Sequence, residues 1–237
     1  MSAFEFCDRC ENVRGVLLTS DQPSFSAGMD LKSLESLQKD EAGSERIQLI
    51  GEALTSPLRC SKPVACVIEG HAIAGGLVLA AACDFIALTR LKDYLLGLTE
   101  LSVGVPFPNE ALECVRHAIK SNRGFRKFVF ESKNLTPASA FALGFGDVLV
   151  IDAKLTAEEW LRRVASFPKG IFETTKRQVH GPFFQRINHP DQTLCDRLPV
   201  GRNREIKRNL TVDALSHMGG SRLTAIKRKN AVPLSKL

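Results

Sequence analysis

The stretch GHAIAGGLVLAAACDF, residues Gly70 to Phe85, decides the fold and suggests where a site lies. Two adjacent glycines, Gly75 and Gly76, begin an almost wholly apolar run, although a glycine inside a helix costs about 1 kcal/mol relative to alanine. At a helix start, however, the first N–H groups have no intrahelical partner and carry the positive end of the helix dipole, so an anionic oxygen can bind there. Close packing of a helix on a strand also requires glycine, and this stretch alone leaves both interpretations open.

Buried strands and helices alternate on both sides of this stretch. Apolar or β-branched runs predict strands at RGVLLTS (Arg14–Ser20), KPVACVIEG (Lys62–Gly70) and CDFIALT (Cys83–Thr89). Between the first two strands, SERIQLIGEALTSPLRC has apolar residues at helical spacing. This alternation is typical of βαβ units and predicts an α/β core with a mainly parallel sheet.

The chain after residue 150 is expected to form a separate region. A helix near the end of the core is signalled by Thr136 as N-cap, Pro137 at the first helical position and Gly144 as the stop. From there the pattern is helical, with few apolar residues from Gly201 on. We therefore predict a core over residues 1–150 and a helical region over residues 151–237.

Composition excludes several classes of protein. The 237 residues are 44% hydrophobic and 24% charged, which is typical of a globular chain, and the longest apolar run is too short for a membrane span. The net charge of +6 permits an acidic partner, but no aromatic residues are interleaved with the basic run Gly201–Leu210, so no nucleic acid is expected. Seven scattered cysteines indicate free thiols, and Cys7 and Cys10 lack the second pair of a zinc site, so no metal is expected.

A second glycine loop, SFSAGMDLKSL (Ser24–Leu34), changes the balance between the two interpretations of Gly75 and Gly76. Gly28 follows a predicted strand and precedes Asp30, a natural N-cap for a helix that begins at Leu31. Two such loops at neighbouring strand ends can each direct one N–H at the same oxygen. That arrangement is an oxyanion hole.

FSAGMDL followed by IEGHAIAGGLVLAAACDFIA resembles the paired signature of the crotonase, or enoyl-CoA hydratase/isomerase, superfamily. The resemblance covers about residues 13–150 and implies that family's spiral of ββα units, an acyl-CoA substrate and no cofactor beyond the coenzyme A that the substrate carries. It also implies that the N–H groups of Met29 and Gly75 polarise the thioester carbonyl. The neighbouring residues that it places at the substrate are Ser26, Ala27, Gly28, Asp30, Leu31, Ala74 and Gly76.

The carboxylates decide which reaction such a site catalyses. The resemblance implies that hydratases of the family use two glutamates to activate a water. At the first of these positions this chain has Val78. The second is Glu100, in a GLTE context that resembles the family's Δ3,Δ2-enoyl-CoA isomerases, whose chemistry needs one base. Phe107 and Pro108 are expected to wall the acyl pocket, although an ordinary turn also explains them.

Several alternatives remain beside this isomerase hypothesis. Taken alone, Glu100 is a surface glutamate near a loop, and Glu110, at a predicted helix start, is a less favoured second acid. His71 is interpreted as structural. The rival functions are another crotonase reaction, such as hydration or thioester hydrolysis, and a non-catalytic relative that binds coenzyme A or RNA.

The two ends of the sequence lead to further expectations. Family members normally begin with a strand pair and a helix before RGVLLTS, whereas this chain starts almost at that strand. We expect a trimmed fold, a shortened form of the sequence or compensation by a neighbouring subunit, with an exposed sheet edge as the physical cost. The resemblance implies homotrimers or hexamers. The terminal Ser235-Lys236-Leu237 resembles a peroxisomal import address, which predicts binding to the import receptor and location in peroxisomes or a related organelle. The isomerase hypothesis, through the resemblance, implies a role in fatty acid β-oxidation.

Overall fold

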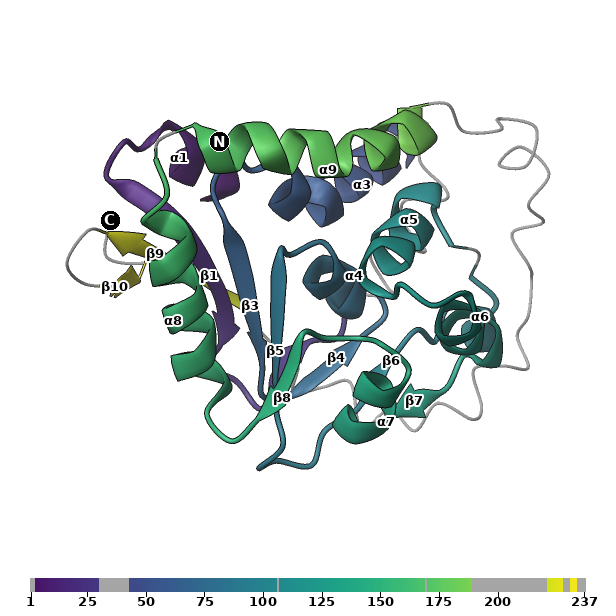
Figure 1. Ribbon diagram of the computed structural model, residues 1–237. Helices are drawn as coiled ribbons and strands as arrows, with labels where there is room; N and C mark the ends of the chain where they lie inside the picture. The colour runs from purple at the N-terminus through teal and green to yellow at the C-terminus, as the bar shows by residue number, and fades with distance from the viewer. Residues whose placement is uncertain are drawn as a thin grey trace.

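Two sheets organise the chain, which is described here from a computed structural model that covers residues 3–29, 43–105, 107–168, 170–188, 221–227 and 231–233 (Figure 1). The larger sheet has the order β10-β9-β1-β3-β5-β8 and the smaller one the order β2-β4-β6-β7. The strands of the larger sheet are β1 (Val13–Ser20), β3 (Val64–Ile68), β5 (Phe85–Thr89), β8 (Val148–Val150), β9 (Ser221–Lys227) and β10 (Ala231–Pro233). Those of the smaller sheet are β2 (Ser24–Ser26), β4 (His71–Ile73), β6 (Leu96–Gly97) and β7 (Asn134–Leu135).

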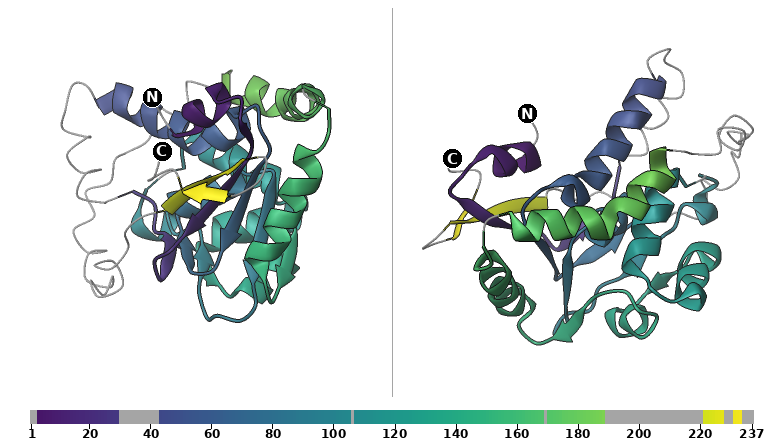
Figure 2. Two further views of the ribbon diagram at one scale, coloured as in Figure 1. Left: turned by 90° about the vertical axis from the view of Figure 1, so that its left-hand side faces the viewer. Right: turned by 45° about the horizontal axis from the view of Figure 1, so that its top comes forward.

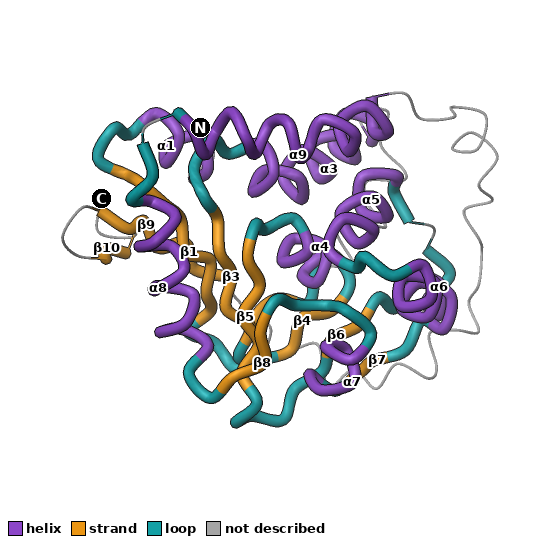
Figure 3. The backbone as a smooth tube through the Cα atoms, viewed as in Figure 1, coloured by secondary structure: helices purple, strands orange, loops and turns teal. Residues whose placement is uncertain are grey.

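Helices cover both faces of the larger sheet, as Figure 3 shows for α8 on one side and α4 and α5 on the other. The helices are α1 (Ala3–Arg9), α3 (Gly43–Arg59), α4 (Gly75–Ala81), α5 (Asn109–Ala118), α6 (Asn122–Glu131), α7 (Pro137–Ala142), α8 (Ala153–Ala165) and α9 (Ile171–Asn188), with a 3-10 turn η1 (Leu101–Val103). The strands β1, β3, β5 and β8 run parallel to one another. The α/β class and the mainly parallel sheet expected from the sequence are confirmed.

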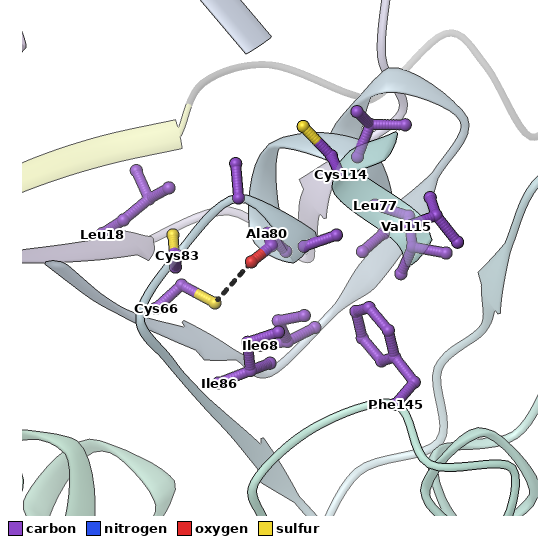
Figure 4. Packing of buried hydrophobic residues seen from close by; sticks show 14 of the residues in the cluster. Leu18, Cys66, Ile68, Leu77, Ala80, Cys83, Ile86, Cys114, Val115 and Phe145 are labelled. Carbon is purple, nitrogen blue, oxygen red and sulfur yellow. Dashed lines mark hydrogen bonds between the residues drawn. The ribbon is translucent and has the colours of Figure 1, made fainter. Parts of the chain in front are cut away.

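The central strands bury side chains on both faces, which explains their continuous apolar runs. In β1, Val16 and Leu18 point into the larger core, whereas Leu17 points towards α8 and packs in a smaller cluster with Leu161. The larger core lies between β3 and β5 on one side and α4 and α5 on the other (Figure 4). There the thiol of Cys66 donates a hydrogen bond to the Ala80 carbonyl over 3.8 Å.

The predicted strands and the helix signals near residue 136 are confirmed. Strands β3 and β5 lie within the runs interpreted as strands, and β1 begins one residue before its run. Pro137 is the first residue of α7, and the hydroxyl of Thr136 accepts a hydrogen bond from the Ser139 N–H as its N-cap. Gly144 follows the helix with a φ of 92°, a left-handed conformation that favours glycine.

The structure corrects the expected connection between the strand that ends near Gly70 and the helix α4. The strand β4 intervenes between Gly70 and the helix, and it belongs to the smaller sheet. Three residues carry too little periodicity to be recognised as a strand, and only their pairing partners in β2 and β6 define them.

A second correction concerns the end of the chain and the sheet edge. The region expected to be helical is so through α9, but the described residues beyond position 220 form β9 and β10. The strand β9 pairs antiparallel with β1 from Ser20↔Ser221 to Val13↔Lys227, and the turned view in Figure 2 shows this hairpin against β1. The edge of β1 that we expected to be exposed is therefore covered, because an open strand edge offers backbone hydrogen bonds to any strand within reach. One helix, α1, precedes β1.

No helix among the described residues is long and apolar enough to cross a membrane.

Candidate active site

The two glycine loops meet at the ends of adjacent strands. The strands β2 and β4 pair in parallel, with Ser24 opposite His71, so the loops that follow them lie at the same edge of the smaller sheet. A Cβ placed on Gly28 would lie 2.7 Å from the backbone nitrogen of Gly75, and one on Gly76 would overlap the carbonyl of Ser26. The backbones approach each other so closely that side chains are excluded at both glycines.

Two backbone N–H groups are available at this junction. The Ser26 hydroxyl accepts the Gly28 N–H over 3.2 Å, and the left-handed Gly28, with a φ of 82°, then turns the chain into Met29. Gly75 is the first residue of α4, so its N–H has no partner one helical turn earlier. A Cβ on Gly75 would lie 3.9 Å from the Met29 nitrogen. Within the described part of the chain, neither the Met29 nor the Gly75 N–H donates to a protein acceptor.

Glu100 is carried to the same region by β6. The strand β6 pairs with β4, and the Ala74 N–H donates to the Gly97 carbonyl over 2.8 Å, so the turn with Glu100 begins one hydrogen bond away from the residue before Gly75. The Glu100 side chain is half-buried, but its Oε2 is shielded from solvent and has no hydrogen-bond partner among the described residues. Burial raises the pKa of the Glu100 carboxyl to about 7, against a smaller lowering by its own backbone N–H. A carboxyl with a pKa near 7 can both take and return a proton at neutral pH.

The other predicted carboxylate positions differ from Glu100. Val78 is fully buried in the larger core, so α4 presents an apolar side chain at the position where the resemblance implies the first glutamate of a hydratase. Glu110 lies in the first turn of α5, as expected, and its carboxyl packs against Gly51 of α3. Of these three positions, Glu100 is the one at which the structure buries a carboxyl oxygen without a hydrogen-bond partner among the described residues.

The remaining predicted site residues lie next to the core, in the glycine loops or outside the described residues. Phe107 is half-buried and packs against the larger core, whereas Pro108 is exposed directly before α5. Ala27 and Ala74 are half-buried in the glycine loops. His71 uses its Nδ1 to accept the Leu95 N–H over 3.1 Å, in agreement with a structural role. The positions outside the described residues are Asp30, Leu31 and 235–237.

A buried polar cluster escaped the sequence analysis. The Lys176 ammonium donates to Asp84 Oδ2 over 2.6 Å and to the Pro57 carbonyl over 2.8 Å, and His180 Nε2 lies 3.3 Å from Asp84 Oδ1. The side chains of Lys176 and Asp84 are 3% and 8% exposed. Because α9 brings Lys176 and His180 to the strand start at Asp84, this cluster fastens α9 to the core. The one signal in the sequence was Lys176 itself, which lies on α9, a helix with only weak segregation of polar and apolar residues.

The imidazole ring of His117 packs edge-on against His180, with ring centroids 4.6 Å apart. Burial, and the nearby His180, lower the pKa of His117 to about 4. Among the described residues, no group of three or more His, Cys, Asp or Glu side chains is arranged to hold a metal ion. His117 of α5 and His180 of α9 thus pack against each other where these two helices meet.

Two backbone donors and one buried carboxyl at the edge of an α/β core define a protein that can polarise a carbonyl group and move a proton beside it. The sequence profile of the enoyl-CoA hydratase/isomerase family matches residues 1–189, so the chain belongs to that family.

Relatives of known name support this assignment. The chain is 26% identical to a probable enoyl-CoA hydratase (echA17) of Mycobacterium avium over 210 residues, which are 87% of this chain and 77% of the relative. It is 24% identical to a peroxisomal enoyl-CoA delta isomerase 2 of Arabidopsis thaliana over 184 residues, 69% of this chain and 76% of the relative. A crystal structure of a probable enoyl-CoA hydratase, EchA3, of Mycobacterium tuberculosis matches the fold with a TM-score of 0.70 at 24% identity, over 82% of this chain and 81% of that one.

Proposed function

We propose that this protein is a Δ3,Δ2-enoyl-CoA isomerase that uses one glutamate. The observation that carries the proposal is Glu100, a buried carboxyl whose Oε2 has no partner among the described residues and whose pKa is raised to about 7. It lies on a turn connected through Gly97 and Ala74 to the loop that presents the Gly75 N–H. A single acid–base group next to an oxyanion hole is what a proton shift next to a thioester requires.

The reaction moves one proton and leaves the composition of the substrate unchanged. The Glu100 carboxylate removes a proton from C2 of a 3-enoyl-CoA, and the N–H groups of Met29 and Gly75 stabilise the negative charge on the thioester oxygen of the dienolate. The same carboxyl then returns the proton at C4, so the double bond lies between C2 and C3. Each backbone donor of this kind is typically worth about 2.7 to 4 kcal/mol to the transition state.

The fully buried Val78 supports isomerisation over hydration. A hydratase must activate a water, and no second carboxylate faces Glu100 from this position of α4. Enoyl-CoA hydration is the second candidate, because several relatives carry that name. Thioester hydrolysis is an outcome that the same experiments identify, and absence of all three reactions would favour a non-catalytic relative that binds coenzyme A or RNA.

The purified protein tests the proposal in two assays. With a 3-enoyl-CoA we expect formation of the conjugated 2-trans product, followed by its ultraviolet absorbance. With the 2-trans compound as substrate we expect no loss of that absorbance, which a hydratase would cause. Hydration without isomerisation would refute the proposal, and release of free coenzyme A would identify a hydrolase.

Location and assembly follow as further proposals. We infer import into peroxisomes or a related organelle from residues 235–237, and the peroxisomal delta isomerase among the relatives is consistent with such a location. A homotrimer or hexamer stays a prediction from the family. A solution mass by light scattering no larger than the 26.0 kDa of one chain would contradict it.

A further inference from the structure

Ser132, at the end of α6, has a backbone conformation that a serine rarely adopts. Its φ of 46° and ψ of 43° are left-handed. The other non-glycine residue with positive φ in the described part of the chain is Ala74, directly before Gly75. Such conformations persist only where the surroundings hold them in place, and they gather at functional sites.

The Ser132 hydroxyl bridges the two ends of the turn that carries Glu100. Its oxygen accepts the Ser102 N–H over 3.0 Å and donates its proton to the Leu98 carbonyl over 3.1 Å. These backbone groups lie two residues after and two residues before Glu100. The left-handed backbone of Ser132 brings the hydroxyl to this position, so the strain and the hydrogen bonds have one explanation.

The remaining hydrogen bonds of the turn are mostly local. The Val105 N–H donates to the Glu100 carbonyl over 2.9 Å, and the Ser102 hydroxyl donates to the Thr99 carbonyl over 2.7 Å. Before the turn, β6 pairs with β7, and the two strands lie side by side in Figure 1. The strand β7 follows Ser132 in the chain. The segment after α6 therefore holds the Glu100 turn at two points, through β7 and through the Ser132 hydroxyl.

We propose that Ser132 is a positioning residue, whose hydroxyl fixes the turn from Leu98 to Ser102 so that the Glu100 carboxyl keeps its buried place. This inference rests on the proposed function for its consequence in catalysis, but its geometric part stands on the contacts of Ser132 alone. If the turn loosens, water reaches the carboxyl. Burial is the main cause of the raised pKa of Glu100, and no charged side chain in the described ranges contributes to it, so hydration should return the pKa towards 4.5.

The test compares the wild-type protein with Ser132→Gly and Ser166→Ala. Glycine removes the hydroxyl but accepts the left-handed backbone, so the fold has no new strain. Ser166 follows α8 as Ser132 follows α6, and its hydroxyl also donates to a carbonyl, that of Arg163, over 2.7 Å. The control therefore loses one local hydroxyl–carbonyl hydrogen bond at a helix end that is far from Glu100 in the chain.

Carboxyl-carbon NMR follows the titration of Glu100, with its signal assigned by its loss in Glu100→Gln. We expect the pKa of Glu100 in Ser132→Gly to fall by at least about one pH unit, since the shift arises from burial, and that in Ser166→Ala to stay at the wild-type value. In turnover of a 3-enoyl-CoA we expect kcat of Ser132→Gly to fall at least about tenfold, since small misplacements of a catalytic group are costly, while KM stays nearly unchanged.

An unchanged Glu100 titration in Ser132→Gly overturns the inference, whatever the activity, because a purely structural role of Ser132 would affect unfolding without moving that titration. An equal shift in Ser166→Ala overturns it as well. If the titration shifts in Ser132→Gly alone but the wild-type protein does not isomerise the substrate, the positioning of Glu100 stands and the proposed function fails.

Discussion

Replacement of Glu100 by glutamine should remove the activity and make the protein more stable above neutral pH. Glutamine keeps the size of the side chain but cannot accept the C2 proton. Isomerisation should therefore fall by about 10²–10⁴, the range that general acid–base catalysis supplies. Binding of the acyl-CoA should persist, because the Met29 and Gly75 donors belong to the backbone.

The gain in stability follows from the pKa of Glu100. Folding raises this pKa from 4.5 to about 7, so between these values the folded protein holds a proton that the unfolded chain releases. The free energy of unfolding of the wild-type protein therefore falls as the pH rises through this window. At about 1.36 kcal/mol for each pH unit, the full effect is about 3 kcal/mol, and residual hydration of the carboxyl makes this an upper value.

Urea unfolding at pH 4 and at pH 8.5, together with turnover of a 3-enoyl-CoA, measures both effects. The difference in unfolding free energy between Glu100→Gln and the wild-type protein should grow with pH by up to about 3 kcal/mol. Glu110→Gln is the matched control, and it should leave turnover and this pH dependence nearly unchanged. If Glu100→Gln retains full activity, the one-glutamate mechanism is wrong and Glu110 becomes the first candidate for the base.

Three further outcomes are expected. Gly28→Ala should fold less stably and lose most activity, since the added methyl would lie 2.7 Å from the Gly75 nitrogen; kinetics and thermal unfolding measure this, and full activity would exclude a close meeting of the two loops. Lys176→Met should lower the free energy of unfolding by about 3–5 kcal/mol, because it leaves Asp84 buried without its cation; a loss below about 1 kcal/mol in urea titrations would show that the pair contributes little. A fluorescent fusion ending in residues 235–237 should enter peroxisomes, and removal of Leu237 should leave it cytosolic.

The sequence predicted those parts of the fold that local patterns encode. The runs that became β1, β3 and β5 are apolar on both faces, and the cap at Thr136 with Pro137 sets the start of α7 through a side-chain hydrogen bond within four residues. The glycine pair Gly75 and Gly76 marked the start of α4 correctly. Such signals depend on neighbours in the chain, so they can be read without knowledge of distant contacts.

The sequence could not predict elements that exist only through pairing. The strand β4 has three residues, and β9 contributes to the sheet because the edge of β1 is within its reach. Asp84, Lys176 and His180 are far apart in the chain, and no local pattern joins them. Their meeting depends on how α9 packs, which is a property of the whole core.

For the candidate site, the sequence by itself determined the chemical groups: two glycine loops, one glutamate at position 100 and a valine at position 78 in place of a second carboxylate. Only the tertiary structure decided that the backbones of Gly28 and Gly75 approach closely, that the Oε2 of Glu100 is buried, and that Ser132 holds the Glu100 turn from the end of α6. The physical reason is that the pKa of a side chain and the approach of two backbones depend on packing against segments that are distant in the sequence. A residue type fixes what a group can do, and its burial fixes at which pH it does so.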